Sequence, residues 1–198
     1  MAFSSPLVLG TGNPGKVKEL RSLLAPLSID LIPADDLDDP PEVLEDADTL
    51  TGNAQKKARA FHDHTTLPVL ADDTGLEVEA LGGGPGVRTA RFAGPDAAPA
   101  DNKRKLLEVM EGVANRRARF RTVAALVDEA GTVHTFDGTC AGTITTEPRG
   151  DGGFGYDPLF LPDGYEQTFA EMPPETKNKI SHRKEALDAV RQFLSNVE

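Results

Sequence analysis

The chain has 198 residues, of which 38% are hydrophobic and 27% charged, a composition typical of one large globular domain or two closely joined lobes. The formal net charge of −11 argues against a nucleic acid partner held mainly by phosphate contacts. A single cysteine, Cys140, excludes an internal disulfide and a multi-cysteine zinc site. No apolar run approaches the ~18 residues of a membrane span and no charged signal start is present, so we expect a cytoplasmic protein without a membrane partner.

The N-terminal part alternates between short apolar runs and segments with apolar residues at helical spacing. Val17, Leu20, Leu23 and Leu24 show the helical spacing, and Pro26 is expected to end that helix. Residues 35–48 are acidic and contain consecutive prolines, which predicts a loop. The predicted strands cover 6–9, 29–32 and the run from 69, and the predicted helices cover 17–24 and 49–62.

The C-terminal part has more strand patterns. Residues 76–81 alternate as a strand does, and the glycines that follow break regular structure. The runs 120–127 and 133–136 flank Glu129-Ala130-Gly131 and predict an antiparallel hairpin. A helix over 101–112, strands over 140–145 and 158–161, and a last helix from Ser181 complete the pattern. This order predicts an elongated, mixed α/β body with a hairpin-rich second lobe.

An acidic pair follows the buried run Val69-Leu70-Ala71. We expect the strand to end here, with Asp72 and Asp73 on opposite faces. Adjacent carboxylates repel each other unless water, a cation or hydrogen-bond donors neutralise them. Since ligands commonly bind where the strands of an α/β sheet end, Asp72 and Asp73 are candidates for a divalent cation site with an activated water. The alternative is a turn with two solvated aspartates.

The glycine-rich segment Gly10-Thr11-Gly12-Asn13-Pro14-Gly15-Lys16 precedes a predicted helix. It matches the dinucleotide fingerprint and most of a P-loop, but Pro14 lacks an N–H for the first and Val17 lacks a hydroxyl for the second. The segment still favours phosphate binding over a plain turn, because Thr11 and Asn13 offer side-chain hydrogen bonds, Lys16 offers a cation and the helix N-terminus offers N–H groups.

Two later segments have the composition of a ligand site. Glycines surround Phe154 in Gly152-Gly153-Phe154-Gly155-Tyr156-Asp157, which would let a planar ligand stack on the ring; a turn with a core phenylalanine is the alternative. Lys177-Asn178-Lys179-Ile180-Ser181-His182-Arg183 gathers cations at the predicted last helix, with Ser181 as a possible N-cap, and suggests an anionic or hydrogen-bond-accepting ligand. The other histidines, His62, His64 and His134, have no spaced partners.

Taken together, these motifs resemble the inosine/xanthosine triphosphate pyrophosphatase family. The similarity runs in one order through almost the whole chain. It rests on Thr11 to Lys16, Asn53-Ala54 with Lys57-Ala58, Ala71 to Leu76, Pro85-Gly86-Val87, Ala90 to Gly94, Pro148-Arg149-Gly150, Gly152 to Pro158, Thr168 to Met172 and Ile180 to Arg183.

The resemblance implies an α/β body with two lobes flanking a nucleotide cleft, usually in a homodimer, that converts purine nucleoside triphosphates such as ITP, dITP and XTP into the monophosphate and pyrophosphate with Mg²⁺. It implies that Glu45 and Asp73 hold the metal, that Asp73 accepts a proton from the attacking water, and that Asp72 assists. The implied substrate-binding residues are Thr11, Gly12, Asn13, Pro14, Gly15, Lys16, Lys57, Thr74, Phe154, Gly155, Tyr156, Asp157, Lys177, His182 and Arg183.

The chain departs from the family pattern in three places. Thr74 replaces the usual serine, Gly52 stands where glutamate is usual, and Arg88-Thr89 replaces Tyr-Ser. The metal ligand in the acidic loop has rivals to Glu45 in Glu42, Asp46 and Asp48. A phosphotransferase or a non-catalytic nucleotide sensor would use similar phosphate contacts, and both remain alternatives.

Overall fold

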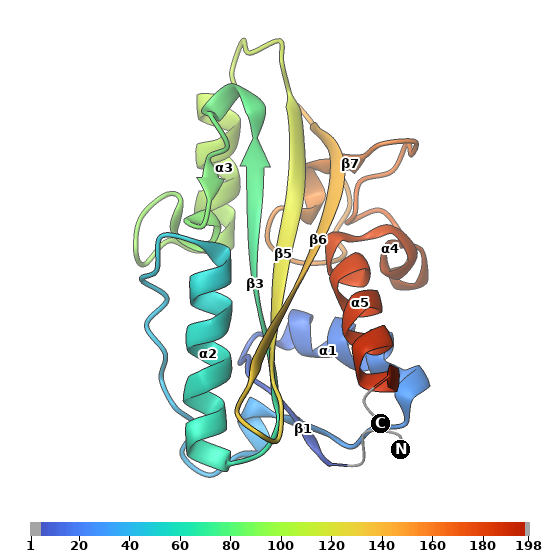
Figure 1. Cartoon of the computed structure of the whole chain (residues 1–198). Helices are drawn as coiled ribbons and strands as arrows, with labels where there is room; N and C mark the ends of the chain where they lie inside the picture. Colours follow the sequence, from blue (N-terminus) through green and yellow to red (C-terminus); the bar gives the residue numbers. More distant parts are fainter. Residues whose placement is uncertain (1–4, 197–198) are drawn as a thin grey trace. The chain divides into compact units, whose positions relative to one another are not determined.

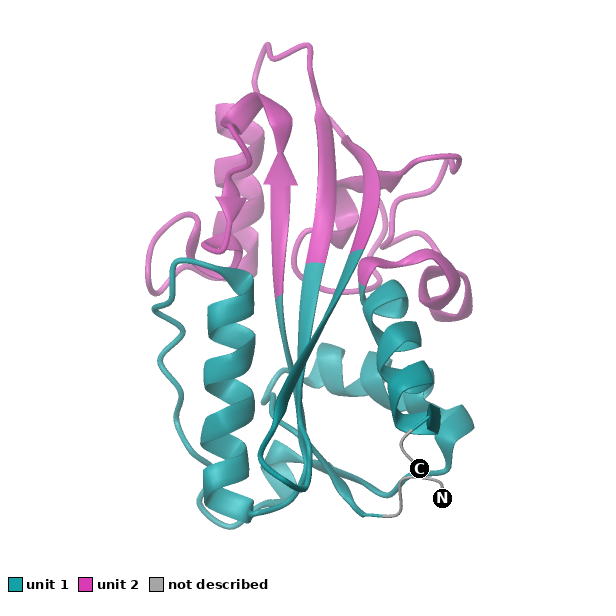
Figure 2. Ribbon diagram, viewed as in Figure 1, with its two compact units in different colours: residues 1–73, 122–138, 183–198 teal, residues 74–121, 139–182 magenta. Residues whose placement is uncertain are grey.

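A computed structural model describes residues 5–196. The chain divides into two compact units: residues 1–73, 122–138 and 183–198 form unit 1, and residues 74–121 and 139–182 form unit 2 (Figure 2). Within the described residues the structure is mixed α/β, as the sequence predicts, and it has a seven-stranded sheet and five α-helices. No helix of residues 5–196 has the length and apolar character needed to cross a membrane.

The sheet has the order β2-β1-β3-β5-β6-β7, and β4 pairs with β3 (Figure 1). The strands are β1 (Leu7–Leu9), β2 (Leu31–Pro33), β3 (Val69–Val78), β4 (Pro85–Gly86), β5 (Arg117–Val127), β6 (Val133–Ile144) and β7 (Phe160–Pro162). The α-helices are α1 (Pro14–Leu24), α2 (Leu50–Thr65), α3 (Pro99–Val109), α4 (Pro174–Ile180) and α5 (His182–Asn196). Pairing is parallel from β2 through β1 to β3 and antiparallel for β3 with β4 and for β6 with β7.

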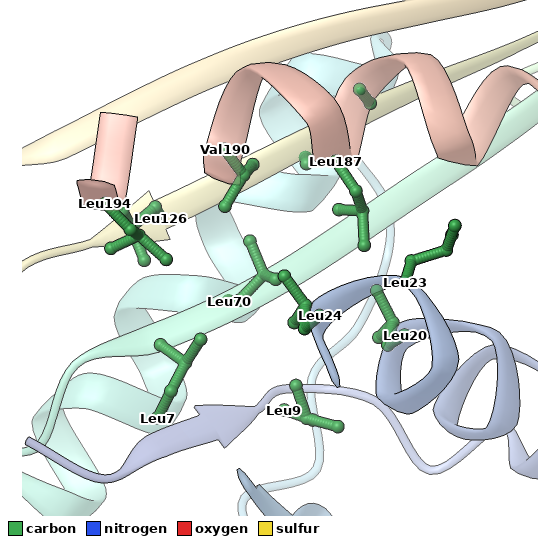
Figure 3. Close-up of a cluster of buried hydrophobic side chains, with 12 residues drawn as sticks. Leu7, Leu9, Leu20, Leu23, Leu24, Leu70, Leu126, Leu187, Val190 and Leu194 are labelled. Atoms are coloured by element: carbon green, nitrogen blue, oxygen red, sulfur yellow. The ribbon is translucent and has the colours of Figure 1, made fainter. Parts of the chain in front are cut away.

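Unit 1 is held together by a leucine-rich core. In Figure 3, Leu187 and Val190 of α5 lie close to Leu24 of α1 and Leu70 of β3. The apolar spacing of α1 and α5 places these side chains on one face of each helix, as amphipathic helices require. Helix α2 packs through Phe61 near Gly10, where an added Cβ would lie 3.3 Å from the Phe61 ring. Gly10 therefore lets the end of β1 approach α2 closely.

Unit 2 has a separate core that is rich in aromatic side chains. Phe120 of β5 packs on Phe160 of β7 with ring centroids 4.7 Å apart, and Phe169 joins them. Leu106 and Met110 of the α3 region are fully buried in the same cluster. Gly142 of β6 permits the close pairing with β7, since a Cβ there would lie 2.4 Å from the Leu161 carbonyl oxygen.

Several predicted element boundaries were wrong, and three of them bear on the candidate site residues. The predicted strand end at Asp72 is replaced by one continuous strand, β3, which runs through Asp72-Asp73-Thr74 to Val78. Helix α1 begins at Pro14 instead of Val17, because Asn13 caps it. Lys177 and Lys179 belong to the separate short helix α4, so they do not lie at the start of α5. The hairpin prediction is confirmed, with β5 and β6 joined by a turn in which the Asp128 N–H donates to the Thr132 carbonyl oxygen.

Candidate functional site

The N-terminal loop of unit 1 is organised by Asn13. Its Oδ1 accepts hydrogen bonds from the N–H groups of Gly15 and Lys16, at 2.9 and 3.2 Å, and so caps α1. The Thr11 hydroxyl accepts from the Asn13 N–H at 3.2 Å. Side chains of the loop thus accept from the N–H groups of Asn13, Gly15 and Lys16, and Lys16 lies in the first turn of the helix.

Asp72 lies at the centre of a buried ion network. Its Oδ2 is 3.1 Å from Lys16 Nζ and 2.9 Å from Arg183 Nη2. Lys16 Nζ also donates to the Asp72 backbone oxygen at 3.1 Å. Arg183 reaches back to Glu19 of α1 through Nη1 at 2.5 Å. The cluster thus contains two carboxylates and two cations, which come from α1, β3 and α5. The side chains of Asp72 and Arg183 are each only 1% exposed.

The charge state of Asp72 follows from these contacts. Burial alone would raise the pKa of the Asp72 carboxyl, but Lys16 and Arg183 together hold it well below its usual range. Burial lowers the pKa of Lys16, and the Asp72 charge opposes that effect. A buried charge pair of this kind is costly to break, because the remaining partner is left uncompensated.

Asp73 points to a different set of partners, as alternation along a strand requires. Its Oδ2 accepts a hydrogen bond from Asn53 Nδ2 at 3.1 Å, and its Oδ1 lies 3.9 Å from Lys57 Nζ. Burial raises the pKa of Asp73, although the Lys57 charge opposes this. The neighbouring aspartates therefore differ in kind: Asp72 is locked in ion pairs, whereas Asp73 is held by one neutral donor and a more distant cation.

The acidic segment 45–47 is fastened to α2 by consecutive contacts. Glu45 Oε2 lies 2.9 Å from Lys57 Nζ, and Asp46 Oδ1 lies 2.6 Å from Lys56 Nζ. The Ala47 N–H donates to Asn53 Oδ1 at 2.9 Å. Of the acidic residues considered as rivals, Glu45 is the one whose carboxylate shares a cation with Asp73.

The carboxylates of Glu45 and Asp73 converge on the ammonium of Lys57, which shows that this position accommodates a positive charge. Residues 5–196 contain no cluster of three or more metal-ligating side chains. Two carboxylates nevertheless suffice for Mg²⁺ where substrate phosphates and water complete its octahedral shell. The donor set therefore fits a cation that binds together with a phosphorylated ligand.

Unit 2 contains a second cluster around Asp157. Lys177 Nζ lies 2.5 Å from Asp157 Oδ2, and both side chains are almost fully buried. The same carboxylate accepts from the Phe154 N–H at 2.8 Å. Lys177 Nζ also lies 4.8 Å from the centre of the Phe154 ring. Gly153 is required for this approach, because a Cβ there would lie 2.1 Å from Asp157 Oδ2 and its φ is +68°.

Two further predicted residues of unit 2 are buried beside this cluster. The His182 ring stacks on Phe120 with centroids 4.6 Å apart, and it also faces Phe169, over which Lys177 Nζ lies at 5.3 Å. The Tyr156 hydroxyl donates to the Thr89 backbone oxygen at 3.1 Å, and burial raises the pKa of Tyr156. The hydroxyl of Thr89 in turn accepts from the Leu76 N–H at 2.8 Å, so the departure at this position keeps a hydrogen-bonded hydroxyl.

The structure thus gathers many of the predicted residues into three groups. In unit 1, Lys16 and Arg183 contact Asp72, while Glu45 and Asp73 lie near Lys57. In unit 2, Phe154, Asp157, Lys177 and His182 lie around one aromatic cluster. Sequence reasoning missed Glu19 and Asn53, whose importance lies in contacts that no local pattern signals; the place of Asn53 in the quoted Asn53-Ala54 motif was the one available hint.

A lysine at a capped helix start and paired aspartates on the central strand of a mixed α/β sheet are features expected of a protein that binds phosphorylated ligands. Comparison with known sequences makes this specific: the chain belongs to the Ham1 family, whose model matches residues 7–193.

Curated relatives carry the name dITP/XTP pyrophosphatase. The protein of that name from Porphyromonas gingivalis is 49% identical over 189 residues, covering 95% of this chain and 96% of the relative. That from Desulforamulus reducens is 48% identical over 193 residues, covering 96% of each. Among solved structures, a HAM1 protein from Coxiella burnetii superposes with a TM-score of 0.87 at 38% identity, and the Staphylococcus aureus Ham1 protein with 0.86 at 33%. Both alignments cover 98% of this chain and 100% of the other.

Proposed function

We propose that the protein hydrolyses non-standard purine nucleoside triphosphates, ITP, dITP and XTP, to the nucleoside monophosphate and pyrophosphate. The observation that carries the proposal is a buried group of two cations and two carboxylates in unit 1: Lys16 lies beside Asp72, and Lys57 lies near Asp73. The pKa of Asp72 is lowered, whereas that of Asp73 is raised. The names of the curated relatives agree with it.

Cleavage between the α and β phosphates needs neutralisation of the leaving pyrophosphate, an oriented water and a proton acceptor. Lys16 and Lys57 supply positive charge for the phosphates, and the Thr11 to Lys16 loop positions the first of them. Asp73 accepts the proton of the attacking water, a role that suits a carboxylate whose pKa is raised by burial. Asp72 keeps Lys16 and Arg183 in place through its ion pairs. Direct attack by water requires no covalent intermediate.

Glu45 and Asp73 would hold Mg²⁺, in keeping with their convergence on the Lys57 ammonium. The bound ion would supply charge neutralisation on the phosphates and a lower pKa for bound water. Lys57 then contacts phosphate in place of Glu45. Thr74, which follows Asp73 in β3, would add a hydroxyl to the substrate-binding residues.

The base and sugar are assigned to unit 2. Phe154 offers a ring for stacking, with Gly155 and Tyr156 beside it, and Lys177 and His182 offer donors for the oxygen at C6 of hypoxanthine or xanthine. Adenine presents an amino group there, so donors without partners would disfavour ATP. That Arg183 also contacts the base stays a prediction; in the structure its guanidinium forms ion pairs with Asp72 and Glu19. The homodimer and the cytoplasmic location stay predictions as well.

The test is a panel of ITP, dITP, XTP, GTP and ATP with Mg²⁺, scored separately for monophosphate, diphosphate, phosphate and pyrophosphate. We expect monophosphate and pyrophosphate in equal amounts, with kcat/KM for ITP, dITP and XTP well above that for ATP and GTP. Binding of ITP without turnover would instead identify a nucleotide sensor. Phosphate transfer to an added acceptor, without hydrolysis, would identify a phosphotransferase.

A further inference from the structure

We propose that Asn53 is a positioning residue that fixes the acidic segment 45–47 relative to Asp73 and thereby sets the affinity of the site for its divalent cation. The inference rests on the proposed function. It is based on two hydrogen bonds of one buried side chain: Asn53 Oδ1 accepts from the Ala47 N–H at 2.9 Å, and Asn53 Nδ2 donates to Asp73 Oδ2 at 3.1 Å. Asn53 is 1% exposed, so water cannot substitute for either partner.

The two partners fix the orientation of the amide. A backbone N–H only donates and a carboxylate only accepts, so the oxygen must face Ala47 and the nitrogen must face Asp73. Aspartate at this position would keep the acceptor but place a carboxylate against Asp73. Alanine would supply neither group.

The bond from Asn53 also distinguishes the two oxygens of Asp73. Oδ2 is occupied by Asn53 Nδ2, whereas Oδ1 faces the Lys57 ammonium at 3.9 Å. Lys57 follows Asn53 by four residues on α2, so both side chains project from one face of the helix. Lys57 also contacts Glu45 at 2.9 Å. The Asp73 oxygen that does not bond Asn53 is therefore the one nearer to the Lys57 ammonium, which Glu45 also contacts.

Gly52 makes the approach of the acidic segment possible. A Cβ at this position would lie 2.8 Å from the Ala47 Cβ and 3.1 Å from the Thr49 hydroxyl oxygen. Ala47 therefore comes close enough to bond Asn53 only because residue 52 has no side chain. Since Glu45 precedes Ala47 by two residues, holding Ala47 limits the positions that the Glu45 carboxylate reaches. Outer contacts that orient ligands in this way typically change metal affinity by ~10–100-fold when removed.

The chain offers a matched control in unit 2. Asn102 of α3 is also buried, with 3% exposure, and it also bridges two partners: Oδ1 accepts from the Ala93 N–H at 2.8 Å and Nδ2 donates to the Ala90 oxygen at 2.9 Å. Its partners are backbone groups and not carboxylates. Asn102→Ala therefore removes an equivalent pair of bonds without touching the proposed cation site.

The experiment measures Mn²⁺ binding by electron paramagnetic resonance in the presence of a non-hydrolysable α,β-imido analogue of ITP, together with melting temperatures. We expect Asn53→Ala to weaken Mn²⁺ binding at least tenfold, and Asn102→Ala to leave it within twofold of wild type despite a comparable fall in melting temperature. Equal losses of Mn²⁺ affinity in both variants, or wild-type affinity in Asn53→Ala, would overturn the inference.

Gly52→Ala is the second variant, because alanine favours the helix while its Cβ displaces Ala47. We expect weaker Mn²⁺ binding with the folded state retained, and unchanged affinity would contradict the proposal even if Asn53→Ala does not fold. Failure of wild type to bind Mn²⁺ with the analogue, or to hydrolyse ITP, would instead refute the proposed function. The two failures are thus distinguishable.

Discussion

The guanidinium of Arg183 lies against the carboxylate of Asp72, with Nη2 and Oδ2 2.9 Å apart and each side chain only 1% exposed, although 111 residues separate them. The contact joins α5 to the strand β3 within unit 1. Asp72 is therefore held by a short, buried ion pair, whereas Asp73 accepts from the neutral amide of Asn53 and lies 3.9 Å from the Lys57 ammonium. The neighbouring aspartates should accordingly respond to mutation in opposite ways.

Asp73→Asn should lower kcat for ITP by at least ~100-fold, because it removes the proposed proton acceptor and metal ligand. The melting temperature should stay the same or rise, since burial disfavours the ionised form of Asp73 in the folded protein. Pyrophosphate release and thermal unfolding measure the two effects. Wild-type activity in this variant would refute the mechanism.

Asp72→Asn should act mainly on stability. Loss of the carboxylate leaves Lys16 and Arg183 without their shared partner, and breaking a buried pair in this way costs about 3–5 kcal/mol. The free energy of unfolding from urea titration tests this expectation. A variant as stable as wild type would show that the pair with Arg183 contributes little.

Lys16→Ala should reduce both kcat and the affinity for ITP, provided that its contact tightens as pyrophosphate departs. Steady-state kinetics with saturating Mg²⁺ separates the two parameters. A raised KM with unchanged kcat would mean that Lys16 binds the ground state and the transition state equally. The exposed Lys18 of the same helix provides the control, as Lys18→Ala removes a neighbouring charge without a buried contact.

Arg183→Ala should lower the melting temperature strongly, because Asp72 keeps only Lys16 of its two cations and Glu19 loses the guanidinium. It should also reduce the kcat/KM ratio of ITP to ATP if Arg183 selects the base. Glu19→Gln is the matched variant, which weakens the network but retains the guanidinium. We expect the ratio to change only in Arg183→Ala. An unchanged ratio in both variants would place base selection elsewhere.

The pH dependence of stability should include a contribution from Asp128 in the turn between β5 and β6. Burial tends to raise the pKa of Asp128, but hydrogen bonds from His134, Thr132 and Ala130 lower it overall. A carboxyl with a lowered pKa in the folded state stabilises above its unfolded pKa, and that stabilisation disappears as the pH falls through the folded value. The difference in unfolding free energy between wild type and Asp128→Asn should therefore shrink as the pH falls below about 4. A constant difference across this range would contradict the assignment.

Much of the fold was predictable from the sequence because its helices are amphipathic and its turns contain glycine or proline. The hairpin around Asp128 is an example, since polar turn residues separate two apolar runs. The end of β3 was not predictable in the same way. Charged residues normally mark the end of a buried strand, yet Asp72 remains inside one because Lys16 and Arg183, distant in sequence, neutralise it.

The candidate site shows a similar division. Lys16 and Asp73 stand in motifs whose charges indicate phosphate and metal binding, so the sequence pattern pointed to them. Lys57 and Glu45 were named only through the family resemblance. Asn53 and Glu19 position other residues of the site through their side-chain contacts. A single amide or a single acid in a helical sequence does not indicate such a role. Their roles depend on tertiary contacts that only the folded chain reveals.

The missing side chain at Gly52 also constrains how this sequence can change. The backbone course of residues 45–47 occupies the space that a side chain at position 52 would need. Glutamate, which the resemblance leads one to expect there, would therefore not be a neutral single exchange in this protein; it would first require a different path for the acidic segment. The effect of a side chain at position 52 therefore depends on where residue 47 lies. A change of the backbone path around residue 47 would have to precede Gly52→Glu, because the single substitution would displace the acidic segment.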